Sequence, residues 1–406
     1  MTRHQGGRMS KAEFIALIAM MFATIAFSID AMLPALPGIG AELSPENPNQ
    51  AQFIVAAFIV GMGIGTFFTG PLSDAYGRKP VILYGAGVYI ASAIVAWLSQ
   101  SLEVVLAARL VMGLGAAAPR VVALAIVRDL FSGREMARMM SIAMMIFTLV
   151  PAIAPLLGAG IIAIAGWRAI FLAFALFAVI IITWMSLRLQ EPLPAENRRP
   201  FRLPLLLAAT RELAGHPVVR TSILVQTLCY GVLFSMIMMV QPVFDQVFGR
   251  AESFPLWFGV VALMSGSASL LNAAIVVRVG MRRIVTWTLA LQIVLSSAML
   301  LLGAAGLPET VRFGLFIFWQ TSVFFMAGMT MGNLNAMAME PVGHIAGMAA
   351  SVIGAVSTVL ATLIAAPVGQ LFDGTLFPLT AAILVMCSLG WLLMLHLARL
   401  EARLLA

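Results

Sequence analysis

Gly70-Pro-Leu-Ser-Asp-Ala-Tyr-Gly-Arg-Lys-Pro80 is a short polar stretch that separates two long apolar runs. Charged and turn-forming residues at this spacing, between segments of membrane length, need an explanation from the rest of the chain. The 406 residues are 62% hydrophobic and only 10% charged, whereas a soluble protein carries about 25% charged residues. The composition therefore predicts a polytopic membrane protein rather than a globular enzyme with one anchor.

Twelve apolar segments are each long enough to cross a bilayer, whose core of about 30 Å needs roughly 20 helical residues. We expect these spans at about 14–36, 52–72, 80–99, 104–127, 139–163, 169–188, 219–243, 255–277, 284–303, 311–337, 346–370 and 377–397. The sequence lacks barrel strands of alternating polarity, so we predict an all-α bundle of two six-helix halves. We expect the N-terminal half at 1–190, a cytoplasmic linker at 191–217 and the C-terminal half at 218–406.

The basic residues predict the orientation of the spans. When the N-terminus is placed in the cytoplasm, most of the 24 Lys and Arg residues fall in cytoplasmic tails and loops. This bias predicts that both termini lie in the cytoplasm. The same bias indicates that the net charge of +7 comes from basic cytoplasmic loops and is not a sign of nucleic-acid binding. Cys229 and Cys387 lie inside apolar runs, so we expect buried thiols rather than a disulfide or a metal site.

The Gly70–Pro80 loop reads Gly-x-Leu-x-Asp-x-x-Gly-Arg-Lys and resembles the loop after the second helix of the major facilitator superfamily. The resemblance implies a gate on the cytoplasmic side, which holds the two halves together and breaks on opening. The residues implied in this gate are Gly70, Asp74, Gly77, Arg78, Lys79 and Arg128. Asp74 is expected to face a helix N-terminus or an arginine such as Arg128. Ala75 stands where the family usually has arginine, and the alternative is a basic turn that only fixes topology.

Arg109 lies inside the fourth predicted span and begins an Arg-x-x-x-Gly pattern that resembles the same family. A charge this deep costs at least a few kcal/mol, so it should face the bundle interior with a partner. Asp30, the only carboxylate well inside a predicted span, lies at a matching depth of about 9 Å below the same edge. We therefore expect proton binding at Asp30 to release Arg109. A static salt bridge that only joins two helices is the alternative.

Two further patterns resemble the Bcr/CflA drug-resistance branch of the superfamily. The first is Asp30 followed by Pro34 and Pro37 in the first span. The second resembles the motif of drug/proton antiporters in the fifth span, although two of its usual glycines are alanines here. Its residues are Pro151, Pro155 and Gly158. An ordinary proline kink is the alternative for this second pattern.

Helices 1, 4, 7 and 10 line the substrate cavity in the superfamily. The polar, aromatic and methionine residues expected there are Arg120, Gln226, Tyr230, Met236, Gln241, Trp319 and Gln320. Methionine would supply an adaptable apolar surface. Arg120 could instead face a lipid headgroup, and ordinary packing is the alternative for each of the others.

These observations predict a secondary transporter of the bacterial inner membrane. We expect proton-driven efflux, by alternating access, of small amphipathic drugs or related compounds, and thus a role in antibiotic resistance. The expected partners are the substrate, protons and the bilayer, with no cofactor, metal or nucleic acid, and the expected state is a monomer. The sequence has no nucleophile elbow or phosphate loop, which argues against an enzyme. The alternatives are a proton-coupled importer of one nutrient, a narrow-specificity metabolite exporter, or a membrane sensor that moves nothing.

Overall fold

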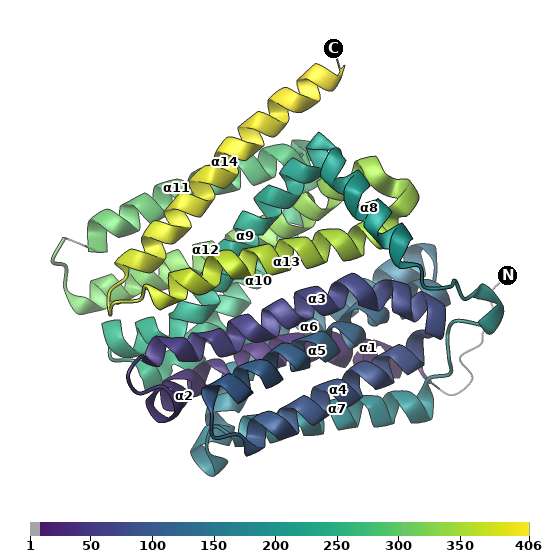
Figure 1. Ribbon diagram of the computed structural model, residues 1–406. Helices are drawn as coiled ribbons and strands as arrows, with labels where there is room; N and C mark the ends of the chain where they lie inside the picture. The colour runs from purple at the N-terminus through teal and green to yellow at the C-terminus, as the bar shows by residue number, and fades with distance from the viewer. Residues whose placement is uncertain (1–8, 304, 406) are drawn as a thin grey trace. The chain divides into compact units, whose positions relative to one another are not determined.

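The computed structural model describes residues 9–303 and 305–405, and within these ranges it contains helices and no strand (Figure 1). The helices are α1 (Lys11–Asp30), α2 (Leu36–Leu43), α3 (Phe53–Tyr76), α4 (Arg78–Leu98), α5 (Leu102–Leu130), α6 (Gly133–Ala165), α7 (Ala169–Arg188), α8 (Leu203–Gly215), α9 (Pro217–Pro242), α10 (Phe254–Val279), α11 (Met281–Gly303), α12 (Glu309–Met339), α13 (Ala346–Gln370) and α14 (Phe377–Leu405). The predicted all-α membrane fold is confirmed.

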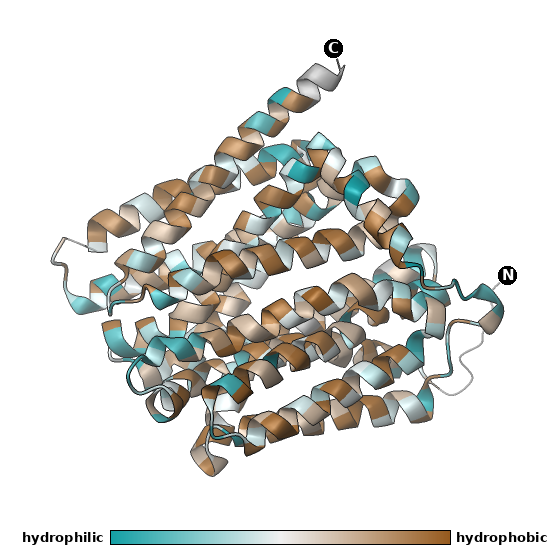
Figure 2. Cartoon of the chain, viewed as in Figure 1, coloured by the Kyte–Doolittle hydropathy of each residue, from teal (hydrophilic) through white to brown (hydrophobic). Residues whose placement is uncertain are grey.

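Eleven stretches of the described residues are long and apolar enough to cross a membrane. The longest, Glu309–Gln370, contains both α12 and α13, which meet at the 3₁₀ segment Glu340–Ile345. It therefore supplies two of the twelve predicted spans. Figure 2 shows apolar residues along the helices, with many of the polar residues near the helix ends. The first predicted span, 14–36, lies within the apolar stretch Lys11–Leu43, in which α1 ends at Asp30 and α2 follows after a short 3₁₀ segment.

The helices form two compact units. The first contains the described residues up to Ala35 together with Ala57–Leu203, and the second contains Leu36–Ala56 and the chain from Pro204 onward. In the first unit, α4 packs against α5 and α7, and α1 packs against α5, α6 and α7. In the second unit, α9 is central and packs against α12, α13 and α14. The expected division into halves at a cytoplasmic linker stays a prediction.

Apolar side chains fill each unit and also cover much of its surface. Ile164 and Val277 are 89% and 91% exposed, as expected for helix faces that meet lipid tails rather than water. Both cysteines are buried in the second unit, at 1% exposure for Cys229 and 0% for Cys387. The Cys387 thiol lies 3.8 Å from the sulfur of Met326. The sequence prediction that these thiols are part of the core is confirmed.

Candidate functional site

The helix α1 breaks directly after Asp30, inside the apolar part of the first unit. Pro34 explains the break, because its ring lacks an N–H and would collide with the carbonyl of the residue four positions earlier, Asp30. The Met32 N–H donates to the carbonyl of Ile29 at 3.2 Å. A continuing helix would have directed it to Ser28 instead. The break therefore leaves the Ser28 carbonyl available to another donor.

Arg109 of α5 supplies that donor. Its Nη2 donates to the Ser28 carbonyl at 3.0 Å, and its side chain is 0% exposed. The guanidinium carbon also lies 4.3 Å from the ring centroid of Phe58 in α3 and 5.9 Å from that of Phe174 in α7. A cation at a helix C-terminus is favourable because the last carbonyls carry a partial negative charge. Arg109 thus caps the broken end of α1.

The Asp30 carboxyl lies at the same broken end and is 5% exposed. Within the residues that the structure describes, no hydrogen bond or ion pair joins this carboxyl to another group. The expected direct contact between Asp30 and Arg109 is therefore not seen. Arg109 instead binds the carbonyl of Ser28, two residues before Asp30.

Glycines bring α3 and α5 close enough to enclose the guanidinium. A Cβ on Gly113, four residues after Arg109, would overlap the carbonyl oxygen of Phe58. A Cβ on Gly61 of α3 would in turn overlap the carbonyl oxygen of Leu110. Only glycine permits this approach of two backbones. The glycine of the Arg-x-x-x-Gly pattern thus seats the Phe58 ring against the cation.

The antiporter-like motif of α6 meets α1 at its break. The helix α6 runs through both Pro151 and Pro155 without ending. A Cβ on Gly158 would overlap the carbonyl oxygen of Ala31, and would lie 2.9 Å and 3.0 Å from the carbonyl carbon and Cα of that residue. Gly160, two residues later, would have no heavy atom within 4 Å of an added Cβ. Gly158 is therefore the position at which α6 touches the residue next to Asp30.

The Gly70–Pro80 loop is organised around Arg78. Gly77 turns the chain with a φ of 101°, a value that side chains rarely permit, and α4 begins at the next residue. The Arg78 guanidinium, 6% exposed, binds Asp129 of α5 at 2.7 Å and Asp74 at 2.6 Å. Asp74 thus binds an arginine, but that arginine is Arg78; among the described residues no ion pair joins Asp74 to Arg128, which is exposed. The cation therefore joins the end of α3 to the end of α5.

The segment after α7 also binds this loop. The Glu191 carboxylate accepts hydrogen bonds from the backbone N–H groups of Arg78 at 2.8 Å and Lys79 at 2.9 Å. A carboxylate is favoured there because the first N–H groups of a helix have no partner within it. The Lys79 ammonium donates to the Leu189 carbonyl at 2.6 Å, just past the end of α7. Sequence reasoning missed Glu191, which lies far along the chain from the loop.

A family model described as Major Facilitator Superfamily matches residues 16–366. The chain belongs to the major facilitator superfamily. Over 335 residues it is 30% identical to the bicyclomycin resistance protein homolog of Haemophilus influenzae, with 80% of each chain covered. Over 385 residues it is 27% identical to the uncharacterized MFS-type transporter YdgK of Bacillus subtilis, with 92% of each covered. The multidrug resistance protein MdtL of Escherichia coli is 34% identical over 169 residues, which cover 41% of this chain and 42% of that protein.

Two solved structures share the fold. The human organic anion transporter MFSD10 (TETRAN) aligns with a TM-score of 0.66 at 18% identity, covering 95% of this chain and 99% of that one. A D-xylose-proton symporter aligns with a TM-score of 0.74 at 13% identity, covering 94% and 97%. At such identities the likeness concerns the fold alone. The resemblance to the drug-efflux branch of the superfamily, first suggested by the sequence motifs, is confirmed by the relatives.

The residues expected in this transporter's substrate cavity have varied surroundings. Arg120 of α5 is half-buried, with Nη1 3.8 Å from the sulfur of Met62. Trp319 is buried and donates from Nε1 to the Ser296 hydroxyl of α11 at 3.1 Å. Tyr230 is half-buried and stacks on a neighbouring phenylalanine of α9. The other members are buried: Gln226, Met236, Gln241 and Gln320. Their role as a cavity lining stays a prediction.

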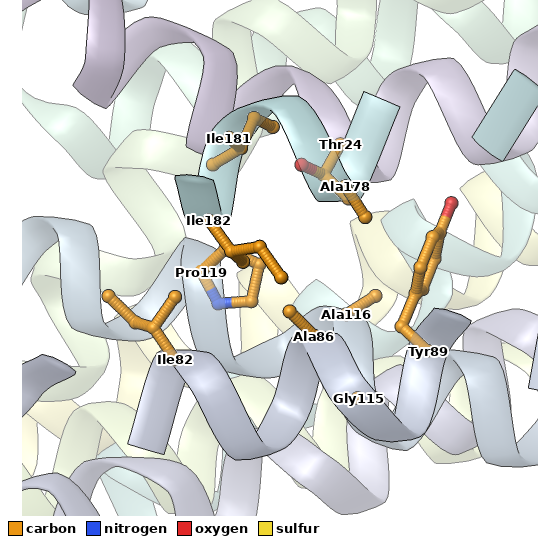
Figure 3. Close-up of a pocket in the computed structure, with 10 residues that line it drawn as sticks. All are labelled: Thr24, Ile82, Ala86, Tyr89, Gly115, Ala116, Pro119, Ala178, Ile181 and Ile182. Atoms are coloured by element: carbon orange, nitrogen blue, oxygen red, sulfur yellow. The ribbon is translucent and has the colours of Figure 1, made fainter. Parts of the chain in front are cut away.

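Tyr89 of α4 joins the site, although no sequence pattern indicated it. Its hydroxyl lies 2.6 Å from the Ser28 hydroxyl of α1, and the side chain is 1% exposed. Figure 3 shows its ring along one side of a largely apolar pocket between α1, α4, α5 and α7, with the hydroxyl at the end farthest from α4. Thr24 lies across the pocket on α1. Tyr89 therefore reaches across from α4 to the end of α1.

Proposed function

We propose that this transporter is a proton-driven exporter of small amphipathic compounds, cationic or neutral, across the bacterial inner membrane. Protons moving inward would drive the substrate outward by alternating access, with both termini in the cytoplasm and a single chain as the working unit. The names of two relatives, a bicyclomycin resistance protein homolog and a multidrug resistance protein, support efflux. The division into two six-helix halves joined by a linker at 191–217 belongs to the same proposal.

One observation carries the proton-coupled part of the proposal. The Asp30 carboxyl is buried at the broken end of α1, and Arg109 binds the backbone of that same end at Ser28. Ionisable groups this deep in a membrane protein are costly and mark proton or substrate pathways. Proton binding at Asp30 would remove a negative charge from the helix end that Arg109 binds at Ser28, and so would change the force that holds α1 to α5. In this proposal, the protonation state of Asp30 determines how firmly the end of α1 is held against α5.

The Arg78 cluster would provide the cytoplasmic gate. Its guanidinium holds the ends of α3 and α5 through two carboxylates, and Glu191 holds the start of α4. Such a cluster gives the first unit a rigid cytoplasmic end. We propose that this end moves as one piece when the transporter changes state. Gly70, Asp74, Gly77, Lys79 and Arg128 complete the proposed gate.

The test is Asp30→Asn, assayed by efflux of ethidium, a small amphipathic cation. Everted membrane vesicles carrying the wild type should accumulate ethidium when a proton gradient is imposed. Asp30→Asn should reduce this rate at least ~10-fold, because a carboxamide cannot carry a proton. Asp373→Asn removes an exposed carboxylate outside the spans and should transport like wild type. Undiminished ethidium transport by Asp30→Asn would show that Asp30 is not the proton carrier.

The direction of proton movement separates export from import. In acid-loaded everted vesicles, added ethidium should release protons from the interior as the cation enters, and a pH-sensitive dye reports this directly. Protons that enter together with the added compound would indicate a symporter and would overturn the proposal. The likeness to a D-xylose-proton symporter does not favour that outcome, since at 13% identity it concerns the fold alone.

A further inference from the structure

Ser28 is held from two sides by two different helices. Its hydroxyl donates to the Thr24 carbonyl of the same helix at 2.6 Å, and it lies 2.6 Å from the Tyr89 hydroxyl. Because the one hydroxyl proton of Ser28 is directed to Thr24, Tyr89 must be the donor in the second bond. The Ser28 carbonyl accepts from Arg109 at 3.0 Å. Tyr89 of α4 and Arg109 of α5 thus bind the same residue, one through its side chain and one through its backbone.

Asp30 lies two residues after Ser28 on the same helix. Residues two apart on an α-helix are separated by about 200° around its axis, so their side chains leave from nearly opposite faces. The bond between Tyr89 and Ser28 therefore does not reach the Asp30 carboxyl. Tyr89 can influence that carboxyl only through the position of the end of α1.

Tyr89 itself is fixed by close packing between α4 and α5. A Cβ on Gly115 of α5 would overlap the carbonyl oxygen of Gly85 and lie 2.9 Å from the Tyr89 backbone nitrogen. The two helices therefore touch backbone to backbone at the point where Tyr89 leaves α4. This close contact between the two backbones restricts the movement of Tyr89, so the position of its hydroxyl restricts where Ser28 can lie.

We propose that Tyr89 is a positioning residue for proton coupling. Its hydroxyl holds the end of α1 through Ser28 and so sets the separation between the Asp30 carboxyl and the Arg109 guanidinium. This inference rests on the proposed function, because it concerns the proton site of that function. Tyr89 takes no part in carrying the proton.

Few ionisable groups lie around the end of α1, so a change in the protonation of Asp30 can be measured without interference from neighbouring groups. Among the described residues of the neighbouring helices, Arg109 of α5 and Tyr89 of α4 are the ionisable residues that hydrogen-bond to this end. The sequence has no ionisable residue at 53–72 in α3, at 150–165 in α6 or at 169–187 in α7. Glu103 binds Ser101 and Arg168 binds Ser99, both at the starts of their helices. Arg120 lies about three turns further along α5.

Removal of the Tyr89 hydroxyl should favour the ionised form of Asp30. Without that bond, Arg109 is the remaining hydrogen-bond donor from another helix to Ser28, and the helix end can shift toward the guanidinium under the attraction between the two charges. A shorter distance to a cation stabilises a carboxylate. The pH at which Asp30 is half-protonated should therefore fall, by at least ~0.5 unit in Tyr89→Phe.

The experiment measures this midpoint without any transported compound. Infrared difference spectra of the purified protein in lipid nanodiscs are recorded between about pH 5 and 9, and the C=O band of protonated Asp30 is assigned by its loss in Asp30→Asn. Tyr89→Phe should shift the midpoint downward, and Ser28→Ala should do the same because it removes the acceptor. Tyr84→Phe changes a tyrosine of the same helix that is 83% exposed and should leave the midpoint unchanged.

The outcomes separate the two levels of the proposal. An Asp30 band that titrates with the same midpoint in wild type, Tyr89→Phe and Ser28→Ala overturns the inference and leaves the proposed function intact. An equal shift in Tyr84→Phe also overturns it, because the effect would then be unspecific. A wild type in which no Asp30 band changes with pH overturns the proposed function, and the inference with it. If Tyr89→Phe does not fold, Ser28→Ala decides the question by itself.

Discussion

Gly158→Ala places one methyl group where α6 touches the broken end of α1. The new Cβ would overlap the Ala31 carbonyl oxygen and lie 2.9 Å and 3.0 Å from its carbonyl carbon and Cα. Ordinary contacts are about 3.5–4.0 Å between carbon atoms, and the carbonyl oxygen is closer still than the two carbons, so the helices must separate by about 1 Å or more. Overpacking of this kind costs about 1–3 kcal/mol. The shift also displaces Asp30, the next residue along α1, and misplacement of a reacting group by ~1 Å can reduce a rate by as much as ~100-fold.

Gly160→Ala is the matched control, because its Cβ would meet no heavy atom within 4 Å. Both variants gain about 0.5–1 kcal/mol from replacing glycine inside a helix. The difference between the two variants therefore isolates the clash. We expect Tm, followed by loss of helical circular dichroism in detergent, to be lower for Gly158→Ala by roughly 1–2 °C for each kcal/mol. Ethidium efflux should fall in Gly158→Ala alone. A Tm of Gly158→Ala equal to or above that of Gly160→Ala would refute the reasoning.

Two further predictions concern the Arg78 cluster at the ends of α3 and α5. Arg78→Gln should lower Tm, because Asp74 and Asp129 then lie close together without the cation between them. We expect the free energy of unfolding to fall by about 1–3 kcal/mol, a moderate loss because both carboxylates are partly exposed. An unchanged Tm would mean that solvent already screens this cluster. Glu191→Gln should also lower Tm, because a neutral amide is a weaker acceptor for the N–H groups at the start of α4. Glu196→Gln, at an exposed position of the same segment, is its control, and equal effects of the two would contradict the assignment.

The helices could be predicted from the sequence because hydrophobic segments of membrane length are a strong and local signal. The break of α1 after Asp30 is not part of that signal, because the apolar stretch itself continues to Leu43. Hydropathy continues past Asp30 through Pro34, so a search for apolar length extends the span to about residue 36. Only the missing N–H and the ring of proline end the helix there. Pro34 belongs to the motif that begins at Asp30, but the apolar pattern alone does not show that this proline ends the helix.

The candidate site was predicted less completely, because depth in the membrane does not determine rotation about a helix axis. Residue counting placed Asp30 and Arg109 at one level, and the structure brings both to the same end of α1. It could not show that the guanidinium binds the Ser28 carbonyl rather than the carboxylate. Tyr89 and Glu191 had no recognisable pattern, since a tyrosine in an apolar run and a glutamate in a linker are both common. Their roles depend on contacts between residues far apart in the chain.

The burial of both cysteines has a practical consequence for spectroscopy. Thiol reagents attack the exposed thiolate, so Cys229 and Cys387 should react slowly with maleimides while the protein is folded. A cysteine introduced at an exposed position such as Tyr84 should therefore be labelled selectively without removing the native pair. Pairs of introduced labels, one in each unit, would then report distances by fluorescence transfer or spin resonance as the pH is changed. The wild-type sequence is thus already suited to site-specific labelling for following changes of conformation in real time.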